Sequence, residues 1–184
     1  NPISIGLPKN DGDSLIFDAA TSKLAEGKVK VALNKGSKLP PDTLLDSSGT
    51  PTRNPAALYT EPRGALMPMG EYKGSGLAIM TDLLAGAIGG GGCHAPGVTA
   101  LSNGMLSFLV DPGVFADRDF VDSETQKFTD WVRQTVPADL NYPVQLPGDP
   151  ERKSETELRK HGITLDDSTW HQIVSTAEDL GVTP

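Results

Sequence analysis

One apolar helical stretch, followed by a run of glycines, constrains this chain more than any other feature. Apolar residues recur at three- and four-residue spacing between Leu77 and Ile88, which is the period of an α-helix with one buried face. The run Gly89–Gly92 follows directly, and glycine commonly ends helices because it adopts left-handed backbone without strain. We therefore expect a helix that begins after Gly76, with Met80 among the residues turned toward the core.

Five short runs have the pattern of β-strands, in which side chains alternate or are apolar throughout. They cover residues 3–7, 14–18, 28–33, 105–110 and 144–146. The run at 105–110 is apolar at almost every position, which predicts a buried strand. Residues 36–62 hold five prolines among turn residues, which predicts an irregular segment lying over the surface.

Three more helices are expected in the last third of the chain. Ser123-Glu124-Thr125-Gln126 matches a capping box, and Phe128 and Trp131 fall on the side that we expect to face inward. Helices near 150–160 and over 168–180 follow, and a glycine ends each of them. These elements predict an α/β fold, in which helices flank a mixed sheet.

Composition excludes several classes of protein. The 184 residues include 16 Lys and Arg against 24 Asp and Glu, so the formal net charge is −8. No basic cluster suits nucleic acid, and no apolar run of about 18 residues suits a membrane span. The single cysteine, Cys93, excludes a disulfide framework, and no ligand set indicates a metal site. We expect a cytoplasmic protein.

The first residues indicate that the sequence is part of something longer. Asn1-Pro2 leads directly into the apolar run at 3–7, with no initiator methionine or flexible leader. Because a domain seldom begins inside a strand, we expect the chain to be the C-terminal part of a longer protein.

The segment Met69–Gly76 is the best candidate for binding chemistry. Glycines and Lys73 lie just before the predicted helix, where free backbone N–H groups and the helix dipole favour a phosphate or carboxylate. The segment fits neither the Walker A motif, in which lysine follows the glycines, nor the dinucleotide fingerprint, whose third glycine is replaced by Ile79. A turn that needs glycine only for its backbone remains an equal alternative.

Two other segments admit both a binding and a structural reading. Asp18–Ser22 follows a strand, where Asp18 can accept from ribose hydroxyls, although a helix cap explains these residues better. Pro147–Glu151 can be explained entirely as a strand-to-helix turn. The three histidines have no acid–base partner that the sequence identifies, so the chain offers no catalytic proton donor.

Taken in order, many short motifs resemble the malate/L-lactate dehydrogenase family. This family of NAD(P)-dependent 2-hydroxyacid oxidoreductases lacks the Rossmann fold and includes ureidoglycolate dehydrogenase and 2,3-diketo-L-gulonate reductase. The matching motifs are Asn1-Pro2-Ile3, Phe17–Ser22, Leu39-Pro40, Asp46 with Gly49–Thr52, Asn54-Pro55, Pro68–Leu84, Asp111-Pro112, Leu146–Gly148 and Gly162–Leu165. The resemblance implies a fold like that of L-sulfolactate and malate dehydrogenases.

The resemblance also implies a cofactor, NAD or NADP, bound by three separated segments. The residues implied as cofactor-binding are Asp18, Ala19, Ala20, Tyr72, Lys73, Gly74, Gly148, Asp149 and Glu151. Residues 1–145 would form the cofactor-binding region and 146–184 the C-terminal helices. The family's catalytic histidine would lie upstream of Asn1, so the resemblance assigns no catalytic residue to this chain, and we expect the fragment alone to be inactive.

Three functions follow as hypotheses. The first is an oxidoreductase, acting as a homodimer, that interconverts a small 2-oxo acid and its 2-hydroxy acid by hydride transfer. The second is a non-catalytic nucleotide-binding or assembly domain, and the third is a reductase of cyclic 2-imino acids. The sequence does not decide between NAD and NADP.

Overall fold

The computed structural model describes residues 2–9, 12–95, 97–98 and 103–183, which separate into two compact units. The first unit comprises residues 20–104 and 163–184, and the second comprises residues 2–19 and 105–162. Helices and small sheets occur together, so the expected mixed α/β class is confirmed.

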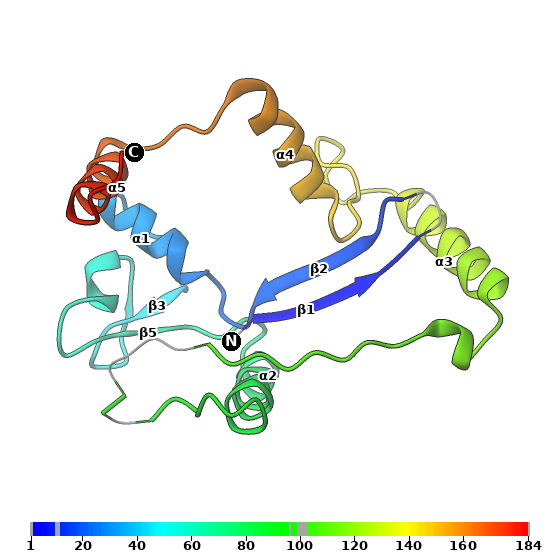
Figure 1. Ribbon diagram of the computed structural model, residues 1–184, viewed down its shortest axis with the longest axis horizontal. Helices are drawn as coiled ribbons and strands as arrows, with labels where there is room; N and C mark the ends of the chain where they lie inside the picture. Colours follow the sequence, from blue (N-terminus) through cyan, green and yellow to red (C-terminus); the bar gives the residue numbers. More distant parts are fainter. Residues whose placement is uncertain (1, 10–11, 96, 99–102, 184) are drawn as a thin grey trace. The chain divides into compact units, whose positions relative to one another are not determined.

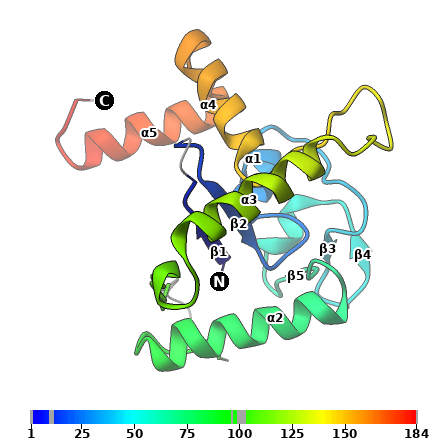
Figure 2. The ribbon, with the colours of Figure 1, turned by 90° about the vertical axis from the view of Figure 1, so that its right-hand side faces the viewer.

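The first unit combines helices with a small antiparallel sheet. Its elements are α1 (Glu26–Asn34), β3 (Leu44–Leu45), β4 (Pro51–Thr52), the 3₁₀ helix η1 (Pro55–Leu58), β5 (Ala65–Leu66), α2 (Tyr72–Asp82), the π-helical turn η2 (Leu83–Ile88) and α5 (Asp167–Asp179). The strand order is β4-β3-β5 (Figure 2). Leu44 lies opposite both Thr52 and Leu66.

The core of the first unit forms where α1 meets the segment that follows it. Val29, Leu39 and Leu44 are almost completely buried and pack together. Helix α5 lies beside α1 (Figure 1), and the Asn34 side-chain amide donates to the Thr169 hydroxyl at 3.3 Å. The segment 36–62 is irregular and mostly exposed, as expected, although it also supplies two leucines of the core, Leu39 and Leu44.

The strand expected at 28–33 is wrong, because these residues form most of α1. Their charged and apolar residues alternate, but Val29 and Ala32 also lie three apart, which puts both on one helix face. That face packs on the core, while Val31 is 42% exposed. Lysine, alanine and leucine favour helix, and Gly36 at φ 63° follows the C-terminal end.

Helix α2 begins earlier than expected, at Tyr72 rather than after Gly76. Gly70 and Glu71, at φ 59° and 54°, make the turn into the helix, so the expected glycine-rich turn is the helix's own first turn. The expected end is confirmed: η2 continues to Ile88 and the glycine run follows.

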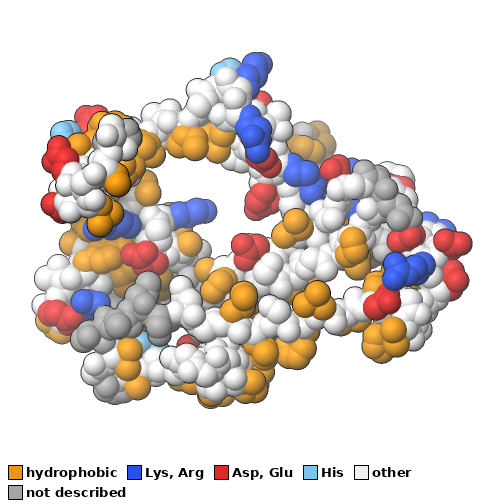
Figure 3. All heavy atoms as spheres, viewed as in Figure 1, with side chains coloured by type: hydrophobic (Ala, Val, Ile, Leu, Met, Phe, Trp, Pro, Cys, Tyr) orange, Lys and Arg blue, Asp and Glu red, His pale blue; other side chains and the backbone are white. Residues whose placement is uncertain are grey.

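The apolar side of α2 and η2 is only partly buried among the described residues. Met80 is 52% exposed and Ile88 is 68% exposed, and Figure 3 shows hydrophobic side chains at the surface at the margin of this helix. Gly74, Thr81 and Gly86 face inward instead. The expectation that Met80 faces the core is therefore wrong for the described residues.

The second unit holds a strand pair and two long helices. Its elements are β1 (Pro2–Leu7), β2 (Leu15–Ala20, of which Ala20 belongs to the first unit), the 3₁₀ helix η3 (Pro112–Val114), α3 (Arg118–Arg133) and α4 (Asp149–His161). The strands expected at 3–7 and 14–18 are confirmed, and they run in opposite directions (Figure 1). Residues 10 and 11 of the turn between them lie outside the described residues.

Two expected strands of the second unit are wrong. Residues 105–110 are extended without ladder partners among the described residues, and Leu109 is 94% exposed. Their apolar composition predicted burial, but Leu106 is only half-buried and the other five residues are exposed. Residues 144–146 are also not a strand, although Leu146 is buried at the turn that opens α4.

The expected capping box of α3 is also wrong. The helix begins at Arg118, five residues before Ser123, because the Asp117 carboxylate accepts from the backbone N–H of Phe120 at 3.2 Å and caps the helix there. Phe128 and Trp131, expected to face inward, are 62% and 66% exposed.

The positions of the last two helices, and the glycines that follow them, agree with expectation. Helix α4 ends at His161 and is followed by Gly162 with φ 82°, and Gly181 with φ 67° follows α5. Among the residues that the structure describes, no helix is both long enough and apolar enough to cross a membrane.

Candidate functional site

In the first unit, the residues after β2 lie against the segment that leads into α2. The Met69 N–H donates to the Thr21 carbonyl at 3.0 Å, and the Lys23 N–H donates to the Met67 carbonyl at 2.8 Å. This short antiparallel ladder includes a bridge between Ser22 and Pro68. Two of the three predicted cofactor segments, at Ala20 and at Tyr72–Gly74, are therefore joined through backbone hydrogen bonds.

The first turn of α2 is shaped by a close backbone approach. A Cβ atom on the buried Gly74 would stand 1.6 Å from the Met69 carbonyl oxygen, so only glycine fits. The side chains of Tyr72, which is 78% exposed, and Lys73 extend into solvent. The turn therefore presents an aromatic ring and an ammonium group at the positive end of a helix.

In the second unit, the Pro-Gly turn is attached to the start of β2. The Ile16 N–H donates to the Pro147 carbonyl at 3.3 Å. The Arg152 guanidinium donates to the Ser14 carbonyl at 3.0 Å through Nη1. The second unit thus joins the turn before α4 to the strand that carries Asp18, which is itself exposed.

The Asp149 carboxylate holds its own turn. It accepts from the Leu146 N–H at 2.8 Å, from Arg152 at 2.5 Å and from Arg133 at 3.1 Å. Burial alone would raise the pKa of Asp149, but the Leu146 hydrogen bond and the two guanidiniums outweigh it and lower that pKa below its ordinary value. Asp149 is therefore ionised near neutral pH, and it fixes the turn at Gly148, whose φ is 96°.

The lowered pKa of Asp149 gives a prediction for acid. A carboxyl whose pKa is lower in the folded state stabilises that state above the unfolded pKa and loses this contribution as pH falls through the folded pKa. We expect Asp149→Asn to cost about 1–2 kcal/mol of unfolding free energy at pH 7. The difference from the parent chain should shrink by pH 3, which urea unfolding at both pH values measures. An undiminished difference at pH 3 would contradict a role for the ionised carboxylate.

The predicted site residues differ in their exposure. Asp18, Tyr72, Lys73 and Glu151 are exposed; Ala19, Ala20 and Asp149 are half-buried; Gly74 and Gly148 are buried. The two buried glycines thus shape turns, whereas the exposed side chains are the ones accessible to a ligand. Arg152 and Arg133 were missed. The i,i+3 spacing of Asp149 and Arg152 was an available signal, but Arg133 lies 16 residues before Asp149 with no local signal.

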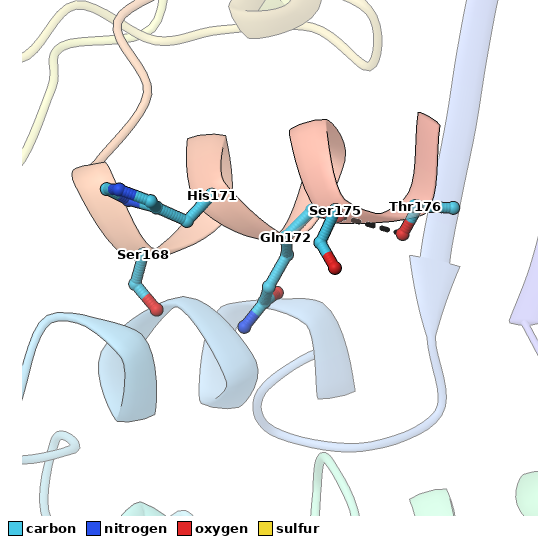
Figure 4. Close-up of a pocket in the computed structure, with 5 residues that line it drawn as sticks. All are labelled: Ser168, His171, Gln172, Ser175 and Thr176. Carbon is cyan, nitrogen blue, oxygen red and sulfur yellow. Dashed lines mark hydrogen bonds between the residues drawn. The ribbon is translucent and has the colours of Figure 1, made fainter. Parts of the chain in front are cut away.

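An open pocket of about 530 Å³ lies along α5 in the first unit (Figure 4). Its lining residues, all from this helix, are Ser168, His171, Gln172, Ser175 and Thr176. His171 Nδ1 lies 2.6 Å from the Asp167 carbonyl oxygen, so that backbone group, and no carboxylate, is its hydrogen-bond partner. The pocket lining therefore lacks an acid–base pair. No group of three metal-ligating side chains occurs within the described ranges.

Comparison with known proteins places this fold among the dehydrogenases. The structure matches that of a putative malate/lactate dehydrogenase from Escherichia coli with a TM-score of 0.81 and 34% sequence identity, over 100% of this chain and 52% of that one. It matches sulfolactate dehydrogenase from Methanocaldococcus jannaschii with a TM-score of 0.68 and 24% identity, over 99% of this chain and 53% of that one. The expected sulfolactate/malate dehydrogenase-like fold is confirmed.

The sequence comparisons specify the family. Residues 1–174 match the family described as malate/L-lactate dehydrogenase. Hydroxycarboxylate dehydrogenase B of Escherichia coli K12 is 36% identical over 99% of this chain and 51% of its own length. A Δ¹-pyrroline-2-carboxylate/Δ¹-piperideine-2-carboxylate reductase of Pseudomonas syringae pv. tomato is 34% identical over 90% of this chain and 48% of its own.

This chain belongs to the malate/L-lactate dehydrogenase family, as its motifs indicated. It spans about half the length of the curated relatives that it matches.

Proposed function

We propose that the protein to which this chain belongs is an NAD(P)-dependent oxidoreductase that interconverts a 2-oxo acid and a 2-hydroxy acid. The observation that carries the proposal is the 36% identity to a hydroxycarboxylate dehydrogenase across 99% of the chain. The bound dinucleotide would supply or accept the hydride, and the protein would bind and orient it.

Groups in the first unit fit a dinucleotide. The exposed Lys73 ammonium stands in the first turn of α2, where the helix dipole adds to its attraction for phosphate. The exposed Tyr72 ring offers a flat surface to an aromatic base or nicotinamide. We propose that Ala20 and Gly74, which lies in the same first turn of α2, complete the first unit's contribution to cofactor binding.

Groups in the second unit fit hydroxyls and backbone contacts. Asp18 is an exposed carboxylate on β2 and suits the hydroxyls of a ribose. Ala19 beside it is small enough for close approach. We propose that the Gly148–Asp149 turn and Glu151 contact the cofactor, with Asp149 acting mainly through the shape of the turn. The proton donor would be a histidine in the half of the relatives' length that this chain does not span.

Cofactor titration tests the proposal directly. Both tryptophans, Trp131 and Trp170, can transfer excitation to a reduced nicotinamide. Titration with NADH and with NADPH should therefore quench the tryptophan fluorescence in a saturable manner with one of the two dinucleotides. Lys73→Ala should weaken binding about tenfold, because a charge-assisted contact to phosphate is lost. Lys28→Ala, an exposed lysine on α1, is the control and should leave affinity unchanged.

Turnover tests the reaction. A full-length protein containing this chain should consume NADH or NADPH in the presence of small 2-oxo acids, followed at the nicotinamide absorbance band. Cofactor binding without any turnover by the full-length protein would instead favour a non-catalytic nucleotide-binding or assembly domain. Absence of binding to either dinucleotide would refute the proposal.

A reductase of cyclic 2-imino acids is the second candidate. The observation that favours it is the 34% identity to a pyrroline/piperideine-2-carboxylate reductase over 90% of the chain. Both reactions deliver a hydride to a carbon beside a carboxylate. They differ in the double bond that accepts it, which is C=O in a 2-oxo acid and C=N in a cyclic 2-imino acid. Product analysis with a cyclic imine and an open-chain oxo acid, supplied together, distinguishes them.

We further propose that the protein acts as a cytoplasmic homodimer. Large apolar side chains exposed on α3, including Phe128 and Trp131, support a protein–protein contact. Light scattering of the full-length protein should give twice the monomer mass, and a monomer at micromolar concentration would contradict the dimer.

A further inference from the structure

We infer that Arg152 is a positioning residue, which holds the Pro-Gly turn before α4 against the start of β2 and thereby sets the affinity for the dinucleotide. The inference rests on the proposed function. Arg152 itself is not among the residues expected to contact the cofactor.

The argument starts from the two hydrogen bonds of one guanidinium. Nη1 of Arg152 donates to the Ser14 carbonyl at 3.0 Å, and Nη2 donates to the Asp149 carboxylate at 2.5 Å. Ser14 and Arg152 are 138 residues apart in sequence, so a single planar group bridges two distant segments. A guanidinium can do this because its donors form a rigid fork.

The two groups that Arg152 bridges, the Ser14 carbonyl and the Asp149 carboxylate, each lie close in sequence to predicted cofactor contacts. Asp149 follows Gly148 in the turn, and Ser14 precedes the strand that carries Asp18 and Ala19. A second bond, from the Ile16 N–H to the Pro147 carbonyl at 3.3 Å, lies beside the first. That backbone bond is long, so the guanidinium is the stronger connection between turn and strand.

The turn also packs tightly against the guanidinium. A Cβ on Gly148 would lie 2.8 Å from Nη1 of Arg152, in a backbone conformation with φ 96° that suits glycine. The Arg152 side chain is 32% exposed, whereas Arg159 on the same helix is 78% exposed and pairs with Glu155 in solvent. Arg152 is thus built into the turn, and Arg159 provides a matched control.

The experiment compares Arg152→Gln, Arg152→Lys and Arg159→Gln in the full-length protein. Three measurements are made: equilibrium binding of NADH and NADPH, steady-state KM and kcat with each of them, and amide hydrogen exchange at Ile16 and Leu146. Arg152→Gln should weaken dinucleotide binding and raise its KM about tenfold, with kcat at saturating cofactor almost unchanged. Exchange at both amides should become faster.

The other variants refine the result. Arg152→Lys keeps the charge near Asp149 but has no rigid fork, so its affinity should lie between those of the parent and Arg152→Gln. If Arg152→Gln does not fold, Arg152→Lys provides the test in its place. Arg159→Gln should match the parent in every readout, because its ion pair stands in solvent.

Specific results would overturn the inference. The first is a dinucleotide affinity of Arg152→Gln within twofold of the parent's, and the second is a fall in kcat with KM unchanged. The third is weaker binding with unaltered amide exchange at Ile16 and Leu146, because that result would indicate that Arg152 contacts the cofactor directly. If the parent protein binds neither dinucleotide, the proposed function fails, and the link to affinity fails with it. Faster exchange in Arg152→Gln would even then show that Arg152 holds the turn.

Discussion

Replacing Gly74 by alanine is expected to destabilise the chain by about 3 kcal/mol or more, a large effect for the addition of a single methyl group. The new Cβ would stand 1.6 Å from the Met69 carbonyl oxygen. The backbone fixes the positions of both atoms, so no side-chain rotation can relieve the clash. Met69 cannot shift freely, because its N–H donates to the Thr21 carbonyl. Strain would therefore spread to the ladder that joins the two predicted cofactor segments.

A second glycine of the same helix provides the control. Gly76 has no heavy atom within 4 Å of the position that a Cβ would take. Gly76→Ala should therefore stabilise α2 by roughly 0.5–1 kcal/mol, since alanine loses less backbone entropy in a helix. Urea unfolding monitored by circular dichroism measures both variants. Equal effects from the two substitutions would show that the first turn of α2 is not packed as described.

Replacing Val29 by alanine should cost about 2–3 kcal/mol of unfolding free energy. Val29 is completely buried and packs with Leu39 and Leu44 in the core of the first unit. Removing its two methyl groups leaves a cavity that these neighbours cannot fill without moving. Val31→Ala, two residues along α1, should change the free energy by less than about 0.5 kcal/mol because Val31 is 42% exposed.

This pair of substitutions also tests the secondary structure. Residues two apart share one face of a strand but lie on nearly opposite sides of a helix. Unequal costs at Val29 and Val31 are therefore expected from α1. Similar costs would support the strand that the alternating sequence pattern predicted and would contradict the helix. The slope of each unfolding curve shows whether the two variants still unfold in one transition.

Sequence patterns predicted elements best where the local signal and the packing agree. Helices α4 and α5 and strands β1 and β2 were expected near their actual positions, because caps, turns and periodicity act within a few residues. The run at 28–33 carried two compatible periods, and contact with Leu39 and Leu44 selected the helix. A local pattern cannot supply that information.

Burial was harder to predict than element type. The apolar residues of 105–110, together with Met80 and Trp131, stand at positions that a core would use, yet all are largely exposed except for Leu106. Apolar composition predicts that a residue is covered, but not which polypeptide covers it. Within the described residues of this chain, these apolar side chains stay exposed.

Glycine and charge patterns in the sequence indicated the candidate cofactor segments. They did not indicate the residues whose contacts hold these segments in place. Lys73 and Gly148 stand out because their sequence neighbourhoods are unusual. Arg133 and Ser14 act on the Asp149 turn through contacts that cross 16 and 138 residues, directly or through Arg152. Such contacts depend on tertiary structure and leave no short motif.

The interleaving of the two units in the sequence has a consequence for biosynthesis. The chain passes between the units at residues 19–20, 104–105 and 162–163, so neither unit is a contiguous segment. Helix α1 reaches its partner α5 only through residues 135 positions later, as the Asn34–Thr169 hydrogen bond illustrates. On the ribosome, the first unit therefore cannot be completed before α5 (Asp167–Asp179) has been synthesised, and a nonsense codon before residue 167 would leave α1 without this neighbour.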